Sequence, residues 1–182
     1  MTLYYAGIGS RKAPPQVCKR LRQWGMALAE VDIVLRSGAA AGADTAFELG
    51  CDVKNGPKEI YLPWKKYQNN PSPYWYIPLE AYEIAADVYG SRWSFVSKET
   101  RMFMARDVLQ ILGITLDTPS NFVVVWTPDG VSTRKDRTKR TGGSGQAIAL
   151  ASELEIPVFN LKNPNADAEA KEFIQELINR DH

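Results

Sequence analysis

Short apolar runs alternate with stretches of helical periodicity along almost the whole chain. The runs that predict strands are Leu3–Ile8, Asp32–Arg36, Glu59–Leu62, Asn121–Trp126 and Ile156–Leu161. The stretches that predict helices begin at Pro14–Pro15, with Val17, Leu21, Trp24 and Leu28 on one face, and continue with Ala43–Val53, Leu79–Tyr89, Thr100–Leu112, a segment opened by Gly142–Gly145, and Ala170–Ile178. Strands that alternate with amphipathic helices pack as a parallel sheet covered on both faces. We therefore expect an α/β fold with a Rossmann-like, doubly wound, mainly parallel sheet of about five strands flanked by helices.

The length of 182 residues suits a single domain spanning 1–182. Two irregular segments interrupt the alternation, namely an aromatic, proline-rich insertion at about 63–78 and a basic loop at about 127–141. Long loops without secondary structure of their own are usually functional or disordered, and the aromatic content of the insertion argues against disorder. Both segments are candidate lids over a functional site.

The charge balance limits the class of partner. Lys and Arg number 22 against 21 Asp and Glu, a formal net charge of +1, which argues against coating nucleic acid by bulk electrostatics but allows a local basic patch. No apolar run approaches the roughly 20 residues that span a bilayer, and no secretory signal is visible. Cys18 and Cys51 are expected to be small buried apolar residues, with a disulfide or metal pair as the alternative. We expect a cytoplasmic protein without membrane contact.

The only histidine is His182, the last residue. A Ser-His-Asp or Cys-His nucleophile system, and a zinc site built on histidine pairs, therefore have no candidate parts. We expect no catalytic residues, no metal site and no required cofactor. Any catalysis would depend on carboxylates, bound water or groups of the ligand itself.

Three glycine-containing turns follow predicted strands and lead directly into helices: Gly7–Arg11, Ser37–Asp44 and Thr141–Gln146. Glycine lets backbone N–H groups approach a ligand oxygen, and the start of a helix adds unpaired donors, so the turns predict a cradle for phosphate or pyrophosphate. Lys12 stands where the dinucleotide fingerprint needs its third glycine, and the P-loop pattern is absent. At the first two turns, sharp bending or tight packing explains the small residues equally well. The predicted ligand-binding residues are Gly7, Gly9, Ser10, Arg11, Arg36, Ser37, Gly38, Gly42, Asp44, Trp126, Gly142, Gly143, Ser144, Gly145 and Gln146.

Charged and aromatic residues beside the turns have two interpretations each. Arg11 and Arg36 would hold a phosphate or form solvated contacts and ion pairs, and Asp44 would accept from a ribose or base or cap the following helix. The run Arg134–Arg140 carries five positive charges and one negative, which is typical of a solvated loop and also of a lid over a phosphorylated ligand. Tryptophans would stack on a base or pack in the core. The residues predicted for a lid are Trp64, Trp75, Arg134, Arg137 and Arg140.

Three segments in order, Tyr5–Arg11, Leu35–Asp44 and Thr141–Ile148, resemble the SLOG superfamily, and the resemblance covers most of the chain. That superfamily joins the Rossmann-like domain of the DNA-processing protein DprA, the lonely-guy cytokinin-activating enzymes, and sensor domains for nucleotide-derived signals. The patterns at Val125–Gly130 and Ile156–Leu161 are most similar to small stand-alone DprA-like proteins of bacteriophages. The resemblance implies a nucleotide-binding crevice and, for a phage protein, a place in the host-cell cytoplasm.

Departures from the motifs separate this chain from two members. Lonely-guy enzymes carry Pro-Gly-Gly-x-Gly-Thr with a catalytic glutamate two residues on, whereas Thr141, Gln146 and Ala147–Ala149 stand at these places here. N-glycosidic hydrolysis on that pattern is therefore not expected. DprA carries Ser-Gly-x-Ala-x-Gly-Ile-Asp, matched at Ser37–Asp44 with Ala43 for isoleucine, but it also uses additional domains for which 182 residues leave no room.

Three functions follow, in order of expectation. The first is binding, without chemistry, of a phosphorylated nucleotide-derived small molecule, with phage sequestration of an immune signal such as a cyclic ADP-ribose isomer as its suggested role. The second is a DprA-like single-stranded DNA-binding recombination mediator, which needs a basic track that only Arg134–Arg140 clearly offers. The third is a nucleotide or ADP-ribose hydrolase in which Asp44, Glu48 or Glu99 acts as base or nucleophile. A homo-oligomer is also open, with the apolar faces of Thr100–Leu112 as its candidate surface.

Overall fold

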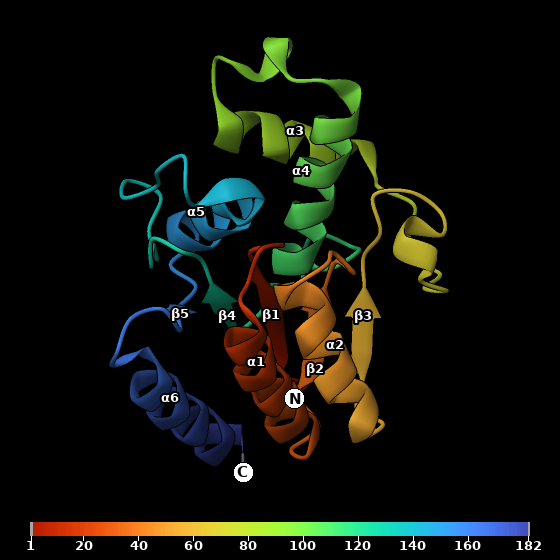
Figure 1. Ribbon diagram of the computed structural model, residues 1–182. Coiled ribbons are helices and arrows are strands. Elements are labelled where there is room, and N and C mark those ends of the chain that lie inside the picture. Colours follow the sequence, from red (N-terminus) through yellow and green to blue (C-terminus); the bar gives the residue numbers. More distant parts are fainter. Residues whose placement is uncertain (1, 182) are drawn as a thin grey trace.

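Five parallel strands form one sheet, with helices on both faces (Figure 1). The computed structural model describes residues 2–181, so His182 lies outside the described residues. The strands are β1 (Tyr4–Gly9), β2 (Val34–Ser37), β3 (Lys58–Ile60), β4 (Phe122–Trp126) and β5 (Val158–Asn160), in the order β3-β2-β1-β4-β5. The helices are α1 (Pro15–Ala29), α2 (Ala43–Val53), α3 (Leu79–Tyr89), α4 (Lys98–Leu112), α5 (Gly145–Glu153) and α6 (Ala166–Asp181), with three 3₁₀ turns, η1 (Tyr67–Asn69), η2 (Trp93–Phe95) and η3 (Gly142–Ser144). The predicted α/β fold with a five-stranded parallel sheet is confirmed.

The sheet separates two apolar cores. Side chains of β1 alternate between them, so that Tyr5 belongs to one core and Ala6 to the other. Helices α1, α2 and α6 cover the face of Tyr5, and α3, α4 and α5 cover the face of Ala6 (Figure 1). Because both faces are covered, a central strand is apolar throughout, as all five buried residues of β4 illustrate.

The order of the strands reverses beside β1. From β1 the chain first builds β2 and β3 on one side, and β4 then pairs with β1 on the other side. In open α/β sheets, ligands bind outside the carboxyl ends of the strands at such a reversal. The loops at the carboxyl ends of β1 and β4 are residues 10–14 and 127–144.

Most predicted elements are confirmed, with boundaries that differ by a few residues. Helix α4 begins at Lys98 rather than Thr100, because the hydroxyl of Ser97 accepts the N–H of Thr100 and caps the helix. The insertion at 63–78 holds the single turn η1 and returns to the sheet, where the N–H of Leu62 donates to the Tyr74 carbonyl at 2.8 Å.

Two further expectations concern surfaces. On the apolar face of α4, Ala105 and Leu109 are buried within the chain and Leu112 is half-buried, and an association of copies through this face stays a prediction. Both cysteines are free; Cys51 is buried and Cys18 is half-buried. Within residues 2–181, no helix combines the length and the apolar character that crossing a bilayer requires.

Candidate functional site

The three predicted turns meet at the carboxyl edge of the sheet. The N–H of Ser10 donates to the carbonyl of Trp126 at 2.9 Å, which joins the first turn to the end of β4. The N–H of Ala43 donates to the carbonyl of Ser10 at 3.2 Å, which joins the second turn to the first. The 3₁₀ turn η3, at the start of the third glycine loop, contacts both β1 and α4. Residues far apart in the sequence therefore line one edge.

Glycines of the first two turns give room to neighbouring protein atoms. A Cβ at Gly7 would lie 2.8 Å from side-chain atoms of Leu35 and Phe47, and one at Gly9 would lie 2.5 Å from the Trp126 carbonyl oxygen. Gly42 has a φ of +82° and packs against the first turn, so a Cβ there would lie 2.6 Å from the carbonyl oxygens of Ser10 and Arg11. Packing is therefore sufficient to explain these three glycines.

A buried charge cluster, which the sequence analysis did not predict, lies beneath the second turn. Asp44, in the first turn of α2, is 4% exposed, and Arg106 and Asp107 of α4 are 4% and 7% exposed. The Nε of Arg106 donates to Oδ1 of Asp107 at 3.0 Å, and its Nη1 donates to the carbonyls of Gly38 and, at 3.4 Å, Tyr61. A Cβ at Gly38 would collide with the Arg106 guanidinium, so this glycine makes room for the cluster.

Burial raises the pKa of both carboxyl groups in this cluster. Desolvation raises the pKa of Asp44 to about 6, against the lowering effects of the Arg106 charge and of backbone N–H groups of Ala40, Gly9 and Gly38. Desolvation also raises the pKa of Asp107 to about 7, where Arg106 opposes it and Asp44 adds to it. Because the Asp44 carboxylate faces backbone N–H groups of the first two turns, the chain's own acid occupies donors that the sequence assigned to a ligand.

Arg11 and Phe103 mark the exposed side of this cluster. The guanidinium of Arg11 is exposed and lies 4.7 Å from the ring centroid of Phe103. Phe103 also packs edge-to-face on Trp64 and Tyr67, with ring centroids 5.3 and 5.5 Å away. Trp64, a predicted lid residue, is thus held in an aromatic cluster, whereas Trp75 is 43% exposed beside the ammonium of Lys65.

The third glycine loop differs from the first two because it is open. Gly142 and Gly143 are exposed, and a Cβ at either would meet no atom within 4 Å. Neither η3 nor α5 receives a side-chain cap, in contrast to α4 with its Ser97 cap. The N–H of Gly145, at the start of α5, already donates to carbonyls of η3, so only the exposed start of η3 leaves N–H groups that an anion can reach.

Asp129 organises the basic loop that precedes these glycines. Its Oδ1 accepts the hydroxyl of Thr127 at 2.8 Å, and its Oδ2 accepts those of Thr138 at 2.7 Å and Thr141 at 2.5 Å. Partial burial acts to raise the pKa of Asp129, but the hydroxyl groups of Thr141, Thr138 and Thr127 outweigh it and lower the pKa to about 2. The loop therefore has a defined shape around an ionised carboxylate.

The three arginines predicted for a lid have different roles within this loop. Arg134 forms an ion pair with Glu153 and donates to the carbonyl of Val88 at 3.1 Å, so it ties the loop to α5 and α3. Arg137 donates to the carbonyl of Gly145 at 3.2 Å, beside the open glycines. Arg140, like Lys139, is exposed. Lys135 of the same loop is exposed as well, so these three cations can be reached by a ligand.

The remaining predicted residues have structural contacts. Arg36 is 2% exposed and donates to Glu59 at 2.7 Å, which favours the ion-pair interpretation, and Trp126 is 8% exposed in the core, which favours packing. Ser37 donates to the carbonyl of Gly7 at 2.6 Å. Gln146 donates to the carbonyl of Ala85 at 2.8 Å and so points toward α3.

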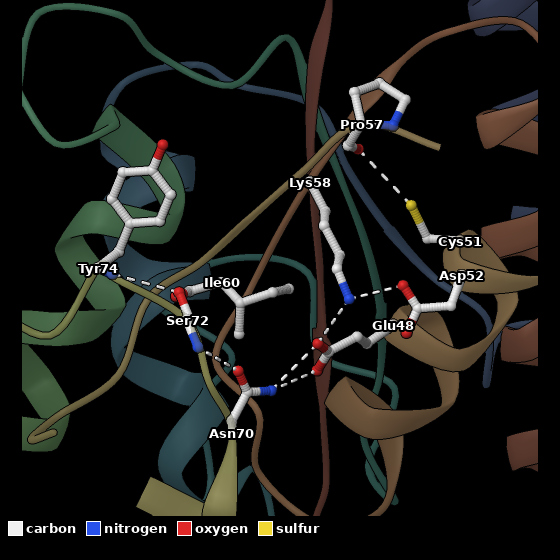
Figure 2. A network of polar contacts seen from close by, with 9 residues as sticks. All are labelled: Glu48, Cys51, Asp52, Pro57, Lys58, Ile60, Asn70, Ser72 and Tyr74. Atoms are coloured by element: carbon white, nitrogen blue, oxygen red, sulfur yellow. Dashed lines mark hydrogen bonds and ion pairs between the residues drawn. The ribbon is translucent and has the colours of Figure 1, made fainter. Parts of the chain in front are cut away.

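The carboxylates considered for hydrolysis belong to separate environments. Asp44 lies in the buried cluster, Glu48 accepts from Lys58 at 2.9 Å and from Asn70, and Glu99 is exposed in the first turn of α4. Figure 2 shows how Glu48 and Asp52 of α2 share Lys58, and how Asn70 reaches Glu48 from the insertion. This network fixes the insertion to α2 and β3.

Charge is segregated between the two edges of the sheet. The carboxyl-edge loops hold ten basic residues, Arg11, Lys12, Lys65, Lys66, Arg134, Lys135, Arg137, Lys139, Arg140 and Lys162, against the acidic Asp129 and Asp136. The described loops of the opposite edge hold one basic residue, Lys54, against the acidic Glu30, Asp32, Asp117 and Glu155. One edge is therefore strongly basic in a chain whose net charge is +1.

The prediction for α4 considered only its apolar face. It therefore missed three buried polar residues, Arg106, Asp107 and Gln110. With its amide oriented to satisfy both neighbours, Gln110 donates to Asp107 at 3.2 Å and accepts from the N–H of Gly38 at 3.0 Å. The signal was present in the spacing: Phe103, Arg106, Asp107 and Gln110 recur at three- and four-residue intervals and so share a second face of the helix. Polar side chains on a helix face that packs against other elements, rather than facing solvent, indicate a buried polar network.

Comparison with known proteins shows the fold alone. No protein-family model matches the chain, and no curated protein matches it. The structure of DNA processing protein A (DprA) from Helicobacter pylori, solved in a study of its single-stranded DNA binding mode, is similar with a TM-score of 0.53 at 18% identity, over 98% of this chain and 79% of that chain. DprA from Streptococcus pneumoniae is similar with a TM-score of 0.54 at 17% identity, over 96% of this chain and 56% of that chain. The chain thus has a DprA-like fold over nearly its whole length, while spanning little more than half of the second protein.

Proposed function

We propose that this chain binds single-stranded DNA along the carboxyl edge of its sheet. The observation that carries the proposal is the segregation of charge, with ten basic residues in the loops of that edge and a net charge of only +1. A polyanion binds where several cations neutralise successive phosphates, which requires basic residues on one surface rather than in one stretch of sequence. Along the sequence only Arg134–Arg140 is clearly basic, but the parallel sheet gathers basic residues from separate loops.

Aromatic rings accompany the cations. Besides Arg11 over Phe103, the ammonium of Lys65 lies 5.6 Å from the ring centroid of Trp75, and the guanidinium of Arg101 lies 5.4 Å from that of Trp93. Trp93 belongs to η2, which stands beyond the carboxyl edge together with α3 (Figure 1). Surfaces that combine cations with aromatic faces suit single strands, because phosphates are neutralised while bases stack. The similarity of fold to a protein described for its single-stranded DNA binding supports the same choice.

The test is fluorescence anisotropy with labelled single-stranded oligonucleotides at several salt concentrations. We expect micromolar binding at low salt that weakens at least tenfold between about 50 and 200 mM salt, as phosphate neutralisation requires. The double variant K139A/R140A removes two exposed cations of the basic loop, and we expect it to bind roughly three- to tenfold more weakly with a shallower salt dependence.

The matched control is K54A/R180A, which removes the same charge from the other side of the molecule. Lys54 pairs with Glu30 and Arg180 with Glu176 at exposed positions, so their loss has little effect on stability. Equal weakening by the two double variants would assign binding to net charge rather than to the carboxyl edge. No binding by the unmodified protein at low salt and about 100 μM would refute the proposal.

A second candidate is binding of a phosphorylated, nucleotide-derived small molecule at the third glycine loop, with sequestration of a cyclic ADP-ribose-like signal as its role. The uncapped start of η3, with exposed Gly142 and Gly143 and Arg137 beside Gly145, favours it. Isothermal titration with a panel of linear and cyclic nucleotides tests it. Heating a saturated complex then separates binding from cleavage, since a binding protein releases the ligand intact and an enzyme releases product.

A further inference from the structure

A groove of about 570 Å³ lies between α1 and α6, which cover the same face of the sheet (Figure 1). The buried side chains of Trp24, Leu28 and Ile174 are among those that line it. Ala27 and Val31 belong to the same lining and are exposed, Val31 by 49%. Because the apolar surface of the groove continues onto exposed residues beside it, this part of the molecule is a candidate contact surface.

One end of the groove is basic. There the Nη2 of Arg20 donates to Oδ1 of Asp167 at 3.1 Å, and the ammonium of Lys171 lies 2.6 Å from Oδ2 of the same carboxylate. Lys19, the neighbour of Arg20 in α1, is exposed and adds another positive charge. Three cations therefore share one carboxylate, and this end carries a net positive charge.

The other end of the groove is acidic. Val31 lines the groove there, and its neighbours Glu30 and Asp32 are both exposed. Lys54 lies 2.5 Å from Oε1 of Glu30, whose side chain is 55% exposed, so the second oxygen of this carboxylate stays open to another cation. Both helices begin on the basic side of the groove, so the partial negative charges of their last carbonyl groups add to the acidic end.

The outer line of α1 repeats this change of sign. Lys19, Gln23, Met26 and Glu30 recur at intervals of four, three and four residues and so lie along one side of the helix. Met26 is half-buried and the other three are exposed. If a second α1 lies antiparallel on this line, Lys19 of each helix faces Glu30 of the other, and Gln23 faces Met26. The line is therefore complementary to itself, which is what an interface between identical copies requires.

We infer that the groove receives α1 of a second copy of this chain, and that the two copies form a dimer with two-fold symmetry and antiparallel α1 helices. In this dimer α1 of each copy lies in the groove of the other, which buries Ala27 and Val31. The basic end of each groove meets the acidic end of the other, and the dipoles of the two α1 helices run in opposite directions. None of the ten basic residues of the carboxyl-edge loops belongs to the groove, so the inference is independent of the proposed function.

The first test is analytical ultracentrifugation of the protein without DNA, at concentrations of about 1 to 300 μM and at about 150 mM salt. We expect the chain to sediment with twice its monomer mass at the upper concentrations, with a dissociation constant of about 1 to 30 μM. Sedimentation as a monomer throughout the range would overturn the inference.

A single charge tests the position of the contact. Ala27→Glu places one carboxylate of each copy near the centre of the interface, and we expect a dissociation constant higher by about tenfold or more. The thermal midpoint should stay within about 2 °C, because the position is exposed and helical. Thr100→Glu adds the same charge at an exposed position of α4, on the opposite face of the sheet, and should leave the dimer unchanged. A dimer that tolerates Ala27→Glu, or one that Thr100→Glu disrupts, would place the contact on another surface and contradict the inference.

A charge exchange tests the antiparallel arrangement and guards against a folding defect. Lys19→Glu and Glu30→Lys each bring like charges together across the two-fold axis, so each should weaken the dimer roughly three- to tenfold. The double variant K19E/E30K restores opposite charges and should associate within about threefold of the unmodified protein. A folding defect in a single variant would not be repaired in this way. Single variants that leave the dimer intact, or a double variant that stays as weak as they are, would refute the arrangement, and neither result bears on DNA binding.

Discussion

The two sides of the carboxyl edge each centre on one aspartate, and the two aspartates behave in opposite ways. On the β2 side, Asp44 is buried near the charge of Arg106 and faces backbone N–H groups, and desolvation raises its pKa to about 6. On the β4 side, Asp129 keeps contact with solvent and accepts three threonine hydroxyls, which lower its pKa to about 2. On the β2 side, charged side chains of the protein fill the space beneath the turn. On the β4 side, the loop has a defined conformation, but the space around Gly142 and Gly143 is empty.

This difference teaches where a ligand can bind. A turn rich in glycine is no anion site when its donors already face an internal carboxylate, because a second anion would be repelled in a desolvated place. At the third turn, the same glycine-rich composition leaves backbone N–H donors free, because Asp129 binds threonine hydroxyls of the preceding loop instead. The following changes would break or sharpen the contrast.

The largest effect is expected from Arg106→Met. The substitution keeps apolar volume but leaves the carboxyl groups of Asp44 and Asp107 buried without their cation, which costs about 3–5 kcal/mol of unfolding free energy. Urea denaturation at pH 7 measures it, and part of the loss should return at pH 5, where the carboxyl groups are protonated. Arg140→Ala, at an exposed position, should change stability by less than about 0.5 kcal/mol. A similarly small loss for Arg106→Met would mean that the cluster does not close this side.

The same substitution at two glycines probes closure directly. At Gly38 a Cβ would collide with the Arg106 guanidinium, so Gly38→Ala should cost about 2–4 kcal/mol, whereas Gly143→Ala meets open space and should cost less than about 1 kcal/mol. Thermal unfolding measures both. If Gly143→Ala also weakens oligonucleotide or nucleotide binding, the open loop is at the ligand; equal stability losses would contradict the contrast between the sides.

The pH dependence of stability offers a third comparison, in which we expect the unfolding free energy to change by about 2 kcal/mol. Burial raises the pKa of Asp107 to about 7, so the folded protein binds this proton more tightly than the unfolded chain, whose Asp pKa is near 4. Its contribution to stability is complete below about pH 4 and is lost as the pH rises through 7. Denaturation between pH 5 and 7.5 should therefore show falling stability with rising pH, and Asp107→Asn should reduce that slope to the part that Asp44, with its pKa of about 6, contributes. An unchanged slope would place the carboxyl group in a hydrated environment.

The smallest effect on stability is expected from Asp129→Asn, about 1 kcal/mol, since its hydroxyl partners remain near solvent. The pH dependence of its contribution is opposite to that of Asp107. Because the pKa of Asp129 is lowered, its carboxylate stabilises the protein above about pH 4, and this stabilisation is lost as the pH falls through 2. Because Asp129 shapes the basic loop, Asp129→Asn should also weaken oligonucleotide binding several-fold although it makes the protein more positive. Asp136→Asn, in the same loop with the same charge change, is the control; tighter binding by both variants would show that charge alone matters.

Sequence reasoning was strongest where periodicity and glycine placement act locally. The alternation from Leu3 to Ile178 predicted the parallel sheet, and the turn at Thr141–Gln146 was placed at the start of a helix as found. It was weakest at Arg36 and Trp126, where a residue beside a glycine turn faces the interior rather than the edge. It missed Arg106 and Asp107 because their partners lie on α2 and in the second turn, more than 60 residues away in the chain.

By itself the sequence determined the fold class and the positions of the three turns, because alternation of apolar strands and helices is a property of neighbouring residues. Only the tertiary structure decided which turn is closed by Asp44 and which is open, and only the strand order placed ten basic residues on one edge. The physical reason is that desolvation and charge segregation depend on what lies nearby in space, which a parallel sheet sets by joining the carboxyl ends of strands that are distant in sequence.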